Sequence, residues 1–489
     1  MNKLRKLTCL LLAMVMVFAL AAAASAEGQH TITAPAGSKR TYEVYQIFTG
    51  DLDAESKVLS NVKWGQNGTG TVGQPVDEAT LEALAAVNAN KSDAEKMAEI
   101  GKYVNLTSTK YGEVKDGSPL TVPNGYYLIK DVGPVDATQG EAYGRYVVKI
   151  VGDTTITPKV SDVSFEKKIK DTNDSTGQTT DWQDSADYDI GDSVPFRLKG
   201  TVADDYAEYT GVYYFAFHDE MEDSLDFEAS SVKVFLDGKE ITTGFTLNNT
   251  AHAFDLVFAD LKDITGVTAD SVITVEYTAK LNDQAVLGKN GNVNKAKLEY
   301  SNNPYTDQKG TTNWDNVIVF TYQVVVNKYA NEVKEGNEKT GAAFKLEKKV
   351  GETWKLVKEF QADETTSTFT FKGLDDGQYK LTETVTPAGF NTIDPIEFTV
   401  TAAHTITWEG ENRNTILTSL NGGTTVTGEI TFTPTDDYGT LTTNVVNKSG
   451  STLPETGGMG TTLFYILGGV LVLAAVVLLV TKKRMRSEN

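Results

Sequence analysis

The sequence has little of what metal sites, disulfide scaffolds and hydrolytic centres are built from. Its 489 residues include one cysteine and four histidines (His30, His218, His252 and His404), which lie far apart. One cysteine excludes a disulfide framework and a cysteine-ligated zinc site. Positive charge is also scarce, and the formal net charge is -21. Because phosphate binding needs a basic surface, we expect no nucleic-acid partner. We also expect no turnover enzyme, no cofactor and no metal.

What the chain does have is length and residues typical of strands. One hydrophobic core stops growing at about 250–300 residues, so 489 residues indicate about three domains. Tyrosine and phenylalanine number 21 and 20, against 12 prolines. This composition favours folded, β-rich structure over a disordered chain.

Residues 1–26 have the three parts of a secretory signal peptide. A basic start precedes an apolar run over 7–24, and Ala24-Ser25-Ala26 is a small-residue cleavage site. The basic residues are Lys3, Arg5 and Lys6. An uncleaved N-terminal anchor is the alternative, but the small-residue site favours cleavage. Cys9 lies inside this peptide, so the exported chain has no thiol.

The C-terminal end carries three elements in a fixed order. Residues 449–460 hold a short linker and the motif Leu453-Pro454-Glu455-Thr456-Gly457, an apolar run over 461–481 follows, and residues 482–489 are basic. The apolar run predicts a transmembrane segment, with the basic tail in the cytoplasm. Motif, apolar run and tail together resemble the sortase sorting signal of Gram-positive surface proteins. The resemblance implies cleavage after Thr456, transfer of its carbonyl to an amine, and a peptidoglycan-anchored protein at the cell wall. A plain single-pass membrane protein is the alternative.

Between these ends the chain divides into three expected domains, over 27–160, 161–322 and 323–448. Removing the seven basic residues and one acidic residue of the two ends takes the formal charge from -21 to -27. So acidic a surface favours solubility and says nothing about the fold.

The first of these segments mixes strand and helix patterns. Residues 42–48 alternate as a half-buried strand does, and residues 77–104 are helical in pattern, with a capping box formed by Ser92 and Glu95. Tyr45-Gln46-Ile47-Phe48 and Lys63-Trp64-Gly65 resemble the N-terminal domain of streptococcal-type backbone pilins. Whether this domain has an internal isopeptide bond is left open.

The second segment consists of short strand patterns separated by Asp, Asn and Gly turns, which is typical of a β-sandwich. Its Asp-rich loop over 171–192 suggests calcium. However, Gly177 stands one place too late for an EF-hand loop and no Glu closes the loop, so we expect no metal there.

The third segment opens with Val324-Val325-Val326-Asn327-Lys328 and ends with Val445-Val446-Asn447-Lys448. It resembles a Cna B-type domain, and the second segment resembles its Cna A-like counterpart. The expected fold class is therefore mostly β: tandem immunoglobulin-like (Cna-type) β-sandwich domains, the N-terminal one with additional helices.

A buried carboxylate is predicted in the third domain. Period-two alternation places Glu383 on the same face as Tyr379 and Leu381, inside the core, where we expect it to be protonated. Residues 379–384 with 387–390 resemble the pilin E-box, although Phe390 stands where the family usually has Tyr. The resemblance implies an intramolecular isopeptide bond from Lys328 to Asn447, formed with Glu383 as the catalytic acid. A surface Glu–Lys pair is the plain alternative.

The second domain carries a related set. Alternation favours Lys167 over Lys168 as the buried amine. His218-Asp219-Glu220-Met221 resembles the His-Asp-x-Met element of pilin middle domains, which makes Asp219 the implied catalytic acid. Residues 291–304 resemble the family's closing strand, with Asn294 as the amide partner; Asn292 has the same parity and stays open.

Thr157-Pro158-Lys159 lies between the first two domains and resembles the pilin motif, commonly Tyr-Pro-Lys. The resemblance implies that Lys159 accepts the Thr456 carbonyl of another subunit. Pro158 favours an extended, accessible segment. An ordinary linker lysine would look similar.

These observations favour the major structural subunit of a covalent, sortase-assembled pilus. Its expected partners are a sortase, identical subunits, minor pilins, peptidoglycan and, as a further possibility, host surface proteins. The alternative is a monomeric, wall-anchored adhesin that binds host matrix, which would not need Lys159. A secreted enzyme is disfavoured because no catalytic motif of the common hydrolase or metalloprotease type is present.

Overall fold

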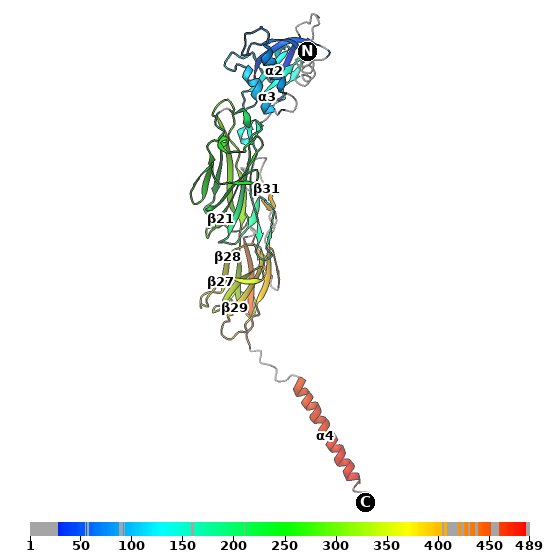
Figure 1. Cartoon of the computed structure of the whole chain (residues 1–489). Coiled ribbons are helices and arrows are strands. Elements are labelled where there is room, and N and C mark those ends of the chain that lie inside the picture. The colour runs from blue at the N-terminus through cyan, green and yellow to red at the C-terminus, as the bar shows by residue number, and fades with distance from the viewer. Residues whose placement is uncertain are drawn as a thin grey trace. The chain divides into compact units, whose positions relative to one another are not determined.

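The structure is a computed structural model, coloured along the chain in Figure 1. It describes residues 28–450 and the helix over 459–485, except 54, 56–57, 88–90, 92, 158–160, 210, 403–404, 408–418, 422–424, 429–430 and 436–438. The signal peptide, Lys159 and the sorting motif at 453–457 therefore lie outside the described residues. By packing, the chain forms two compact units. Unit 1 comprises residues up to 172 together with 179–321 and 403–423, and unit 2 comprises 173–178, 322–402 and the remainder.

The N-terminal part of unit 1 is built on a five-stranded sheet whose central strand is the one predicted from alternation. The sheet has the order β3-β2-β6-β8, with β4 pairing to β2, and a three-stranded sheet has the order β5-β1-β9. The strands are β1 (Gln29–Thr33), β2 (Thr41–Asp53), β3 (Val58–Trp64), β4 (Gly112–Lys115), β5 (Leu120–Pro123), β6 (Gly125–Asp131), β8 (Arg145–Ile150) and β9 (Thr154–Thr155).

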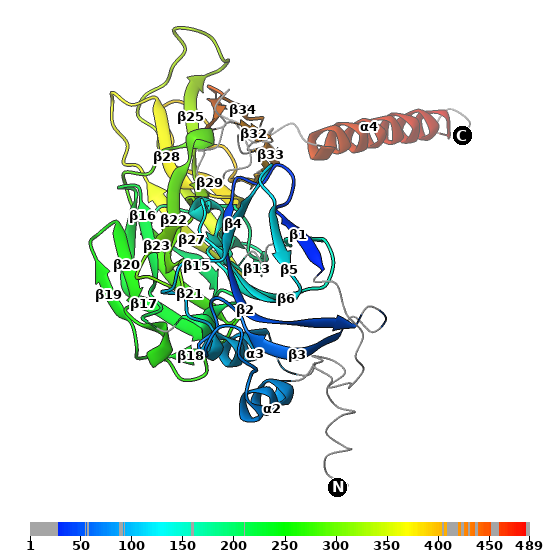
Figure 2. The same cartoon turned by 90° about the horizontal axis from the view of Figure 1, so that it is seen from above.

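Two short helices pack beside this sheet, as the pattern over 77–104 predicts. They are α2 (Glu78–Ala86) and α3 (Asp93–Ile100), and Figure 2 shows them near β3. Asp77 caps α2, because its side chain accepts a hydrogen bond from the Thr80 backbone N–H at 2.9 Å. Leu84 and Met97 reach a core that includes Trp64. The predicted capping residue Ser92 lies outside the described part of the chain.

The middle part of unit 1 is a β-sandwich of two sheets. The five-stranded sheet has the order β11-β15-β21-β17-β18; the seven-stranded sheet has the order β14-β24-β22-β16-β20-β19, with β23 pairing to β22. The strands are β11 (Phe165–Ile169), β14 (Ser185–Asp187), β15 (Ser193–Thr201), β16 (Phe215–Met221), β17 (Leu225–Leu236), β18 (Lys239–Ile241), β19 (Thr246–Asn249), β20 (Ala253–Phe258), β21 (Val272–Leu281), β22 (Asn292–Ser301), β23 (Lys309–Thr311) and β24 (Asp315–Phe320). Alternate residues of both sheets meet in one apolar core, as a sandwich requires.

Short elements complete unit 1 and its junctions. They are β7 (Glu141–Ala142), β10 (Ser161–Asp162), β12 (Thr172–Asn173), β13 (Gln178–Thr179), β31 (Thr405–Thr407), β32 (Ser419–Asn421), η1 (Gly101–Tyr103), η2 (Ala137–Gln139), η3 (Tyr206–Glu208), η4 (Leu261–Asp263) and η5 (Gly288–Asn290).

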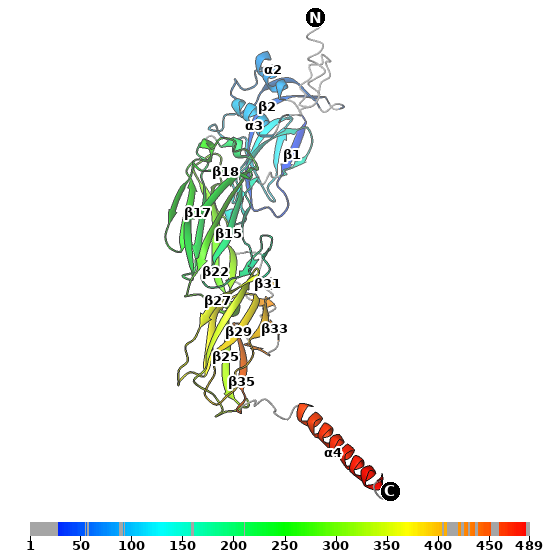
Figure 3. The same cartoon turned by 60° about the horizontal axis from the view of Figure 1, so that its bottom comes forward.

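Unit 2 is a second sandwich, with its own core. A four-stranded sheet has the order β28-β25-β35-β34, and a five-stranded sheet has the order β27-β26-β29-β30-β33. The strands are β25 (Tyr322–Ala330), β26 (Ala343–Val350), β27 (Thr353–Glu359), β28 (Thr368–Leu374), β29 (Gly377–Val385), β30 (Ile396–Thr401), β33 (Thr425–Gly428), β34 (Thr433–Pro434) and β35 (Thr440–Asn447). The first and last long strands, β25 and β35, run parallel and adjacent (Figure 3). The mostly-β prediction is thus confirmed, while the division into three domains stays a prediction.

One expectation about the C-terminal end needs correction. Residues 461–481 lie in a helix, α4 (Met459–Met485). Within the residues that the structure describes, however, no helix is both long enough and apolar enough to cross a lipid bilayer. The predicted transmembrane segment is therefore not supported.

Candidate functional site

The structure brings together the lysine, glutamate and asparagine predicted for the third domain. Lys328 lies on β25 and Asn447 on the neighbouring strand β35, where Asn447 pairs in register with Ala330. Glu383 lies on β29, in the facing sheet, and its carboxyl points across the sandwich. The side chains of Lys328 and Glu383 are fully buried, and Asn447 is 0% exposed.

Glu383 links the other two residues of this cluster. Its Oε1 lies 4.0 Å from the Lys328 amine nitrogen, and its Oε2 accepts a hydrogen bond from the Asn447 Nδ2 at 2.9 Å. Asn447 Nδ2 also donates to the Asn391 carbonyl at 2.6 Å. Glu383 Oε1 and Asn447 Oδ1 have no hydrogen-bond partner among the described residues. The cluster therefore holds an amine, a carboxyl and an amide. The carboxyl and the amide each leave one oxygen without a hydrogen bond, which is costly in a core.

Burial changes the acid–base chemistry of the amine. Because desolvation disfavours the ammonium form, it lowers the pKa of Lys328 to about 8, and the nearby Glu383 only partly opposes this. A substantial fraction of Lys328 is therefore a neutral nucleophile near physiological pH.

The middle sandwich contains a second cluster of the same composition. Lys167 lies on β11 in the five-stranded sheet, whereas Asp219 (β16) and Asn294 (β22) lie on adjacent strands of the seven-stranded sheet. The Lys167 amine lies 2.5 Å from Asp219 Oδ2, and both side chains are fully buried. Here, unlike in unit 2, the amine and the amide come from opposite sheets.

Burial pushes the acid and the amine of this cluster toward their neutral forms. Desolvation lowers the pKa of Lys167 and raises the pKa of Asp219, with the attraction between the two groups opposing both shifts. Both shifts favour a neutral amine beside a protonated acid, which is the arrangement that amide formation needs.

Tyr277, on β21, is a member of this cluster that the sequence analysis missed. Its hydroxyl accepts from the Lys167 amine at 2.6 Å and from the Asn294 Nδ2 at 3.0 Å, and it donates to Asp219 Oδ2 at 2.6 Å. Alternation of Ile273, Val275 and Tyr277 along β21 marks these residues as inward-facing. Alternation therefore predicts that Tyr277 is buried. It does not predict that Tyr277 contacts Lys167, because that depends on how the strands are arranged in the sandwich.

The geometry separates the two candidate amides of the middle domain. The Asn292 amide is occupied by backbone: its Oδ1 accepts from Val286 N at 2.8 Å, and its Nδ2 donates to the carbonyls of Val286 and Val319. Asn294 Oδ1 has no hydrogen-bond partner among the described residues. Asn294 is therefore the better candidate.

The two neighbouring lysines of the middle domain differ in burial, and the choice of Lys167 as the reacting amine stays a prediction. Lys167 is 0% exposed, whereas Lys168 pairs with Asp184 at 2.5 Å on the outer face.

In the N-terminal part, within the described residues of 28–157, no lysine is buried. Whether this part forms a third bond of this kind stays open.

Lys159 itself lies outside the described residues, but the chain is anchored on both sides of it. Before it, Ile156 is 3% exposed and its N–H donates to the Thr33 carbonyl at 2.7 Å. After it, β10 pairs with β7, which sets Asp162 opposite Glu141.

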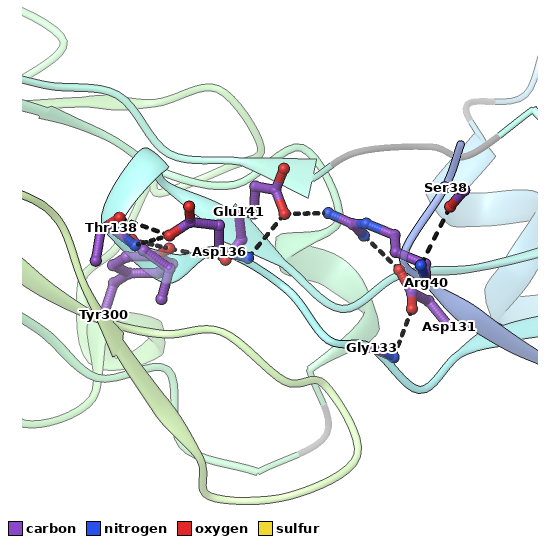
Figure 4. Close-up of polar contacts among 9 residues, drawn as sticks. Ser38, Arg40, Asp131, Gly133, Asp136, Thr138, Glu141 and Tyr300 are labelled. Carbon is purple, nitrogen blue, oxygen red and sulfur yellow. Dashed lines mark hydrogen bonds and ion pairs between the residues drawn. The ribbon is translucent and has the colours of Figure 1, made fainter. Parts of the chain in front are cut away.

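A charged network holds β7 in place (Figure 4). Arg40 pairs with Asp131 through one nitrogen and with Glu141 Oε2 through the other, at 2.5 Å. The Tyr300 hydroxyl, from the middle sandwich, donates to the Glu141 carbonyl at 2.9 Å. The N-terminal and middle parts therefore share a polar junction at β7.

Comparison with known families matches two parts of the chain, one in the third segment and one at the C-terminal end. Residues 324–414 match the SpaA family, described as a prealbumin-like fold domain, and residues 445–489 match the LPXTG cell wall anchor motif. The anchor motif makes the chain a cell-wall-anchored surface protein.

One curated relative and two solved structures resemble larger parts of the chain. The trypsin-resistant surface T6 protein of Streptococcus pyogenes serotype M6 is 24% identical over 301 residues, 50% of this chain and 52% of the relative. This chain thus matches about half the length of that curated relative. The structure of the T6 backbone pilin covers 86% of this chain and 98% of its own, with a TM-score of 0.51 and 19% identity, which shows a shared fold. The full-length major pilin SpaD of Corynebacterium diphtheriae covers 87% and 98%, with a TM-score of 0.48 and 17% identity.

Proposed function

We propose that this protein is the major structural subunit of a covalent pilus, assembled by a sortase and carrying internal Lys–Asn bonds. The cell wall anchor motif and the fold shared with the T6 backbone pilin support it. The single observation that carries the polymer is the fold shared with the T6 backbone pilin, over 86% of this chain. The pair of buried Lys–acid–Asn clusters, one in each sandwich, supports the internal bonds. Covalent bonds between strands suit a protein that transmits tension.

The polymerisation step joins two copies. A sortase thiol attacks the Thr456 carbonyl, the bond to Gly457 breaks, and the amine of Gly457 leaves with a proton. The Lys159 amine of the next subunit then attacks the thioester, expels the thiol and forms an amide. Pro158 and the anchored segments on either side of 158–160 suit an extended acceptor strand.

The internal bond of the third domain needs no external enzyme. The neutral Lys328 amine attacks the side-chain carbon of Asn447, and ammonia leaves. Glu383 contacts the leaving nitrogen of Asn447 and lies near the Lys328 amine. It can therefore take a proton from the amine and give one to the leaving nitrogen. Fixed geometry inside the core replaces the concentration that a bimolecular reaction would need.

A wall-anchored monomeric adhesin would share the anchor and the internal bonds but would not need Lys159. An immunoblot of boiled cell-wall extract separates the two functions. A ladder of ever-larger species supports the pilus. A single band of anchored monomer would reject it.

A further inference from the structure

The two buried clusters differ in how the acid reaches the leaving group. In unit 2 the Glu383 carboxyl contacts the Asn447 Nδ2 directly, at 2.9 Å. In the middle sandwich, among the described residues, no hydrogen bond joins Asp219 to Asn294. Aspartate is shorter than glutamate by one methylene group, and its carboxyl stays on the amine side of the cluster, 2.5 Å from the Lys167 nitrogen.

The Tyr277 hydroxyl occupies the place between acid and amide. It lies 2.6 Å from Asp219 Oδ2 and 3.0 Å from Asn294 Nδ2, the atom that must depart as ammonia. The ring is held by stacking on Phe196, with centroids 5.4 Å apart, and by edge contact with Phe254 at 4.9 Å. The hydroxyl is therefore fixed in position and shielded from water.

We propose that Tyr277 is a catalytic residue for the Lys167–Asn294 bond, relaying a proton from Asp219 to the departing amide nitrogen. This rests on the proposed function, because it assumes that the bond forms. The proposal assigns to the middle domain a two-group relay, Asp219 and Tyr277, where the third domain uses Glu383 alone.

The step balances without any other reactant. A bond forms between Lys167 Nζ and the Asn294 side-chain carbon, and the bond from that carbon to Nδ2 breaks. In the structure the Tyr277 hydroxyl donates to Asp219 and accepts from Nδ2. Attack by the amine ends the conjugation of Nδ2 and makes it basic, so the hydroxyl turns and gives its proton to Nδ2. Asp219 then gives its proton to the tyrosine oxygen and regains one from Nζ. Ammonia leaves, and both relay groups return to their starting forms.

Burial supports this assignment of protons. Desolvation raises the pKa of Asp219, which favours the protonated carboxyl, and it raises the pKa of Tyr277 well above its usual value. A buried tyrosinate would be costly, so the hydroxyl passes a proton on only as it receives one. A concerted relay satisfies this condition.

The test uses the full chain and the isosteric variant Tyr277→Phe, which keeps the ring and removes the hydroxyl. Each protein is isolated unfolded, before its internal bonds have formed, and is then allowed to fold. Its intact mass is followed with time. The wild type should lose two ammonia molecules. Tyr277→Phe should lose the ammonia of the third domain on time and that of the middle domain about 100-fold or more slowly, the usual contribution of a positioned acid or base.

Two further variants separate catalysis from folding. Tyr209→Phe removes another buried hydroxyl of the same sandwich, one that donates to the Ser301 carbonyl at 3.0 Å outside the cluster, and should form both bonds normally. In the double variant Tyr277→Phe with Asp219→Glu, the longer acid should reach Nδ2 and restore the bond. Formation at the wild-type rate in Tyr277→Phe, or no rescue in the double variant, would overturn the relay. Absence of the Lys167–Asn294 bond from the wild type would instead reject the bond and, with it, the relay.

Discussion

The side-chain nitrogen of Asn447 lies 2.9 Å from Oε2 of Glu383, although the two residues come from opposite sheets of unit 2 and are 64 positions apart in the chain. This contact puts a proton-transfer group on the atom that would leave when Lys328 attacks. It makes the internal bond of the third domain open to direct test.

Glu383→Gln should leave the third-domain bond unformed, because the amide cannot accept the proton of Lys328. Measured against its own sequence mass, the full chain should then lose one ammonia fewer than the wild type does. The bond would close a loop of about 120 residues, so its loss should lower the free energy of unfolding by roughly 4–5 kcal/mol, by analogy with a disulfide. Intact mass and denaturant unfolding measure the two effects.

A control for this variant exists in the same unit. Glu347 pairs with Lys345 at 3.1 Å, outside the cluster. Relative to its own sequence mass, Glu347→Gln should lose as much ammonia as the wild type does. If Glu383→Gln also loses as much, Glu383 has no part in the reaction.

Formation of the third-domain bond should depend on pH through the amine. Burial lowers the pKa of Lys328 to about 8, and only the neutral amine attacks. The rate during refolding should therefore rise with pH up to about 8, level off above it, and fall about tenfold per pH unit well below it. Acid-quenched samples analysed by intact mass give the profile; a flat rate between pH 6 and about 9 would contradict a rate-limiting neutral amine.

These clusters show what the sequence could and could not predict. Strict alternation along one strand was enough to bury Glu383 and to prefer Lys167 over its neighbour. The role of Tyr277 could not be predicted, because alternation along one strand does not show which strands face each other across the core. The expected transmembrane segment was not supported, although its apolar run does lie within the helix α4.

The junction between the N-terminal and middle parts should depend on Arg40. Its side chain satisfies Asp131, which is 4% exposed, and Glu141 on β7. Arg40→Gln leaves a buried carboxylate without its cation, so we expect a loss of about 3–5 kcal/mol in the stability of this part. Thermal unfolding of the full chain measures it.

An exposed pair provides the comparison for Arg40. Lys102 and Glu99 lie 2.5 Å apart, with the lysine side chain 63% exposed, and such surface pairs contribute little to stability because solvent screens them. Lys102→Gln should therefore leave the unfolding temperature nearly unchanged. Equal effects of the two substitutions would show that the Arg40 network adds nothing beyond a surface pair.

Polymer formation should fail when the acceptor amine is removed and the anchor is kept. Lys159→Ala should abolish the high-mass ladder while monomer still reaches the wall, since the sorting motif is intact. Deleting residues 453–457 should instead prevent wall linkage altogether. Immunoblots of wall and membrane fractions distinguish the two variants, and normal polymers from Lys159→Ala would mean that another lysine is the acceptor.

The most direct test of the whole account is mass spectrometry of proteolysed high-mass material from the cell wall. The account predicts a branched peptide in which the carbonyl of Thr456, at the end of Leu453-Pro454-Glu455-Thr456, is joined to the side-chain nitrogen of Lys159. High-mass material that lacks this branch, or joins Thr456 only to peptidoglycan, would contradict it.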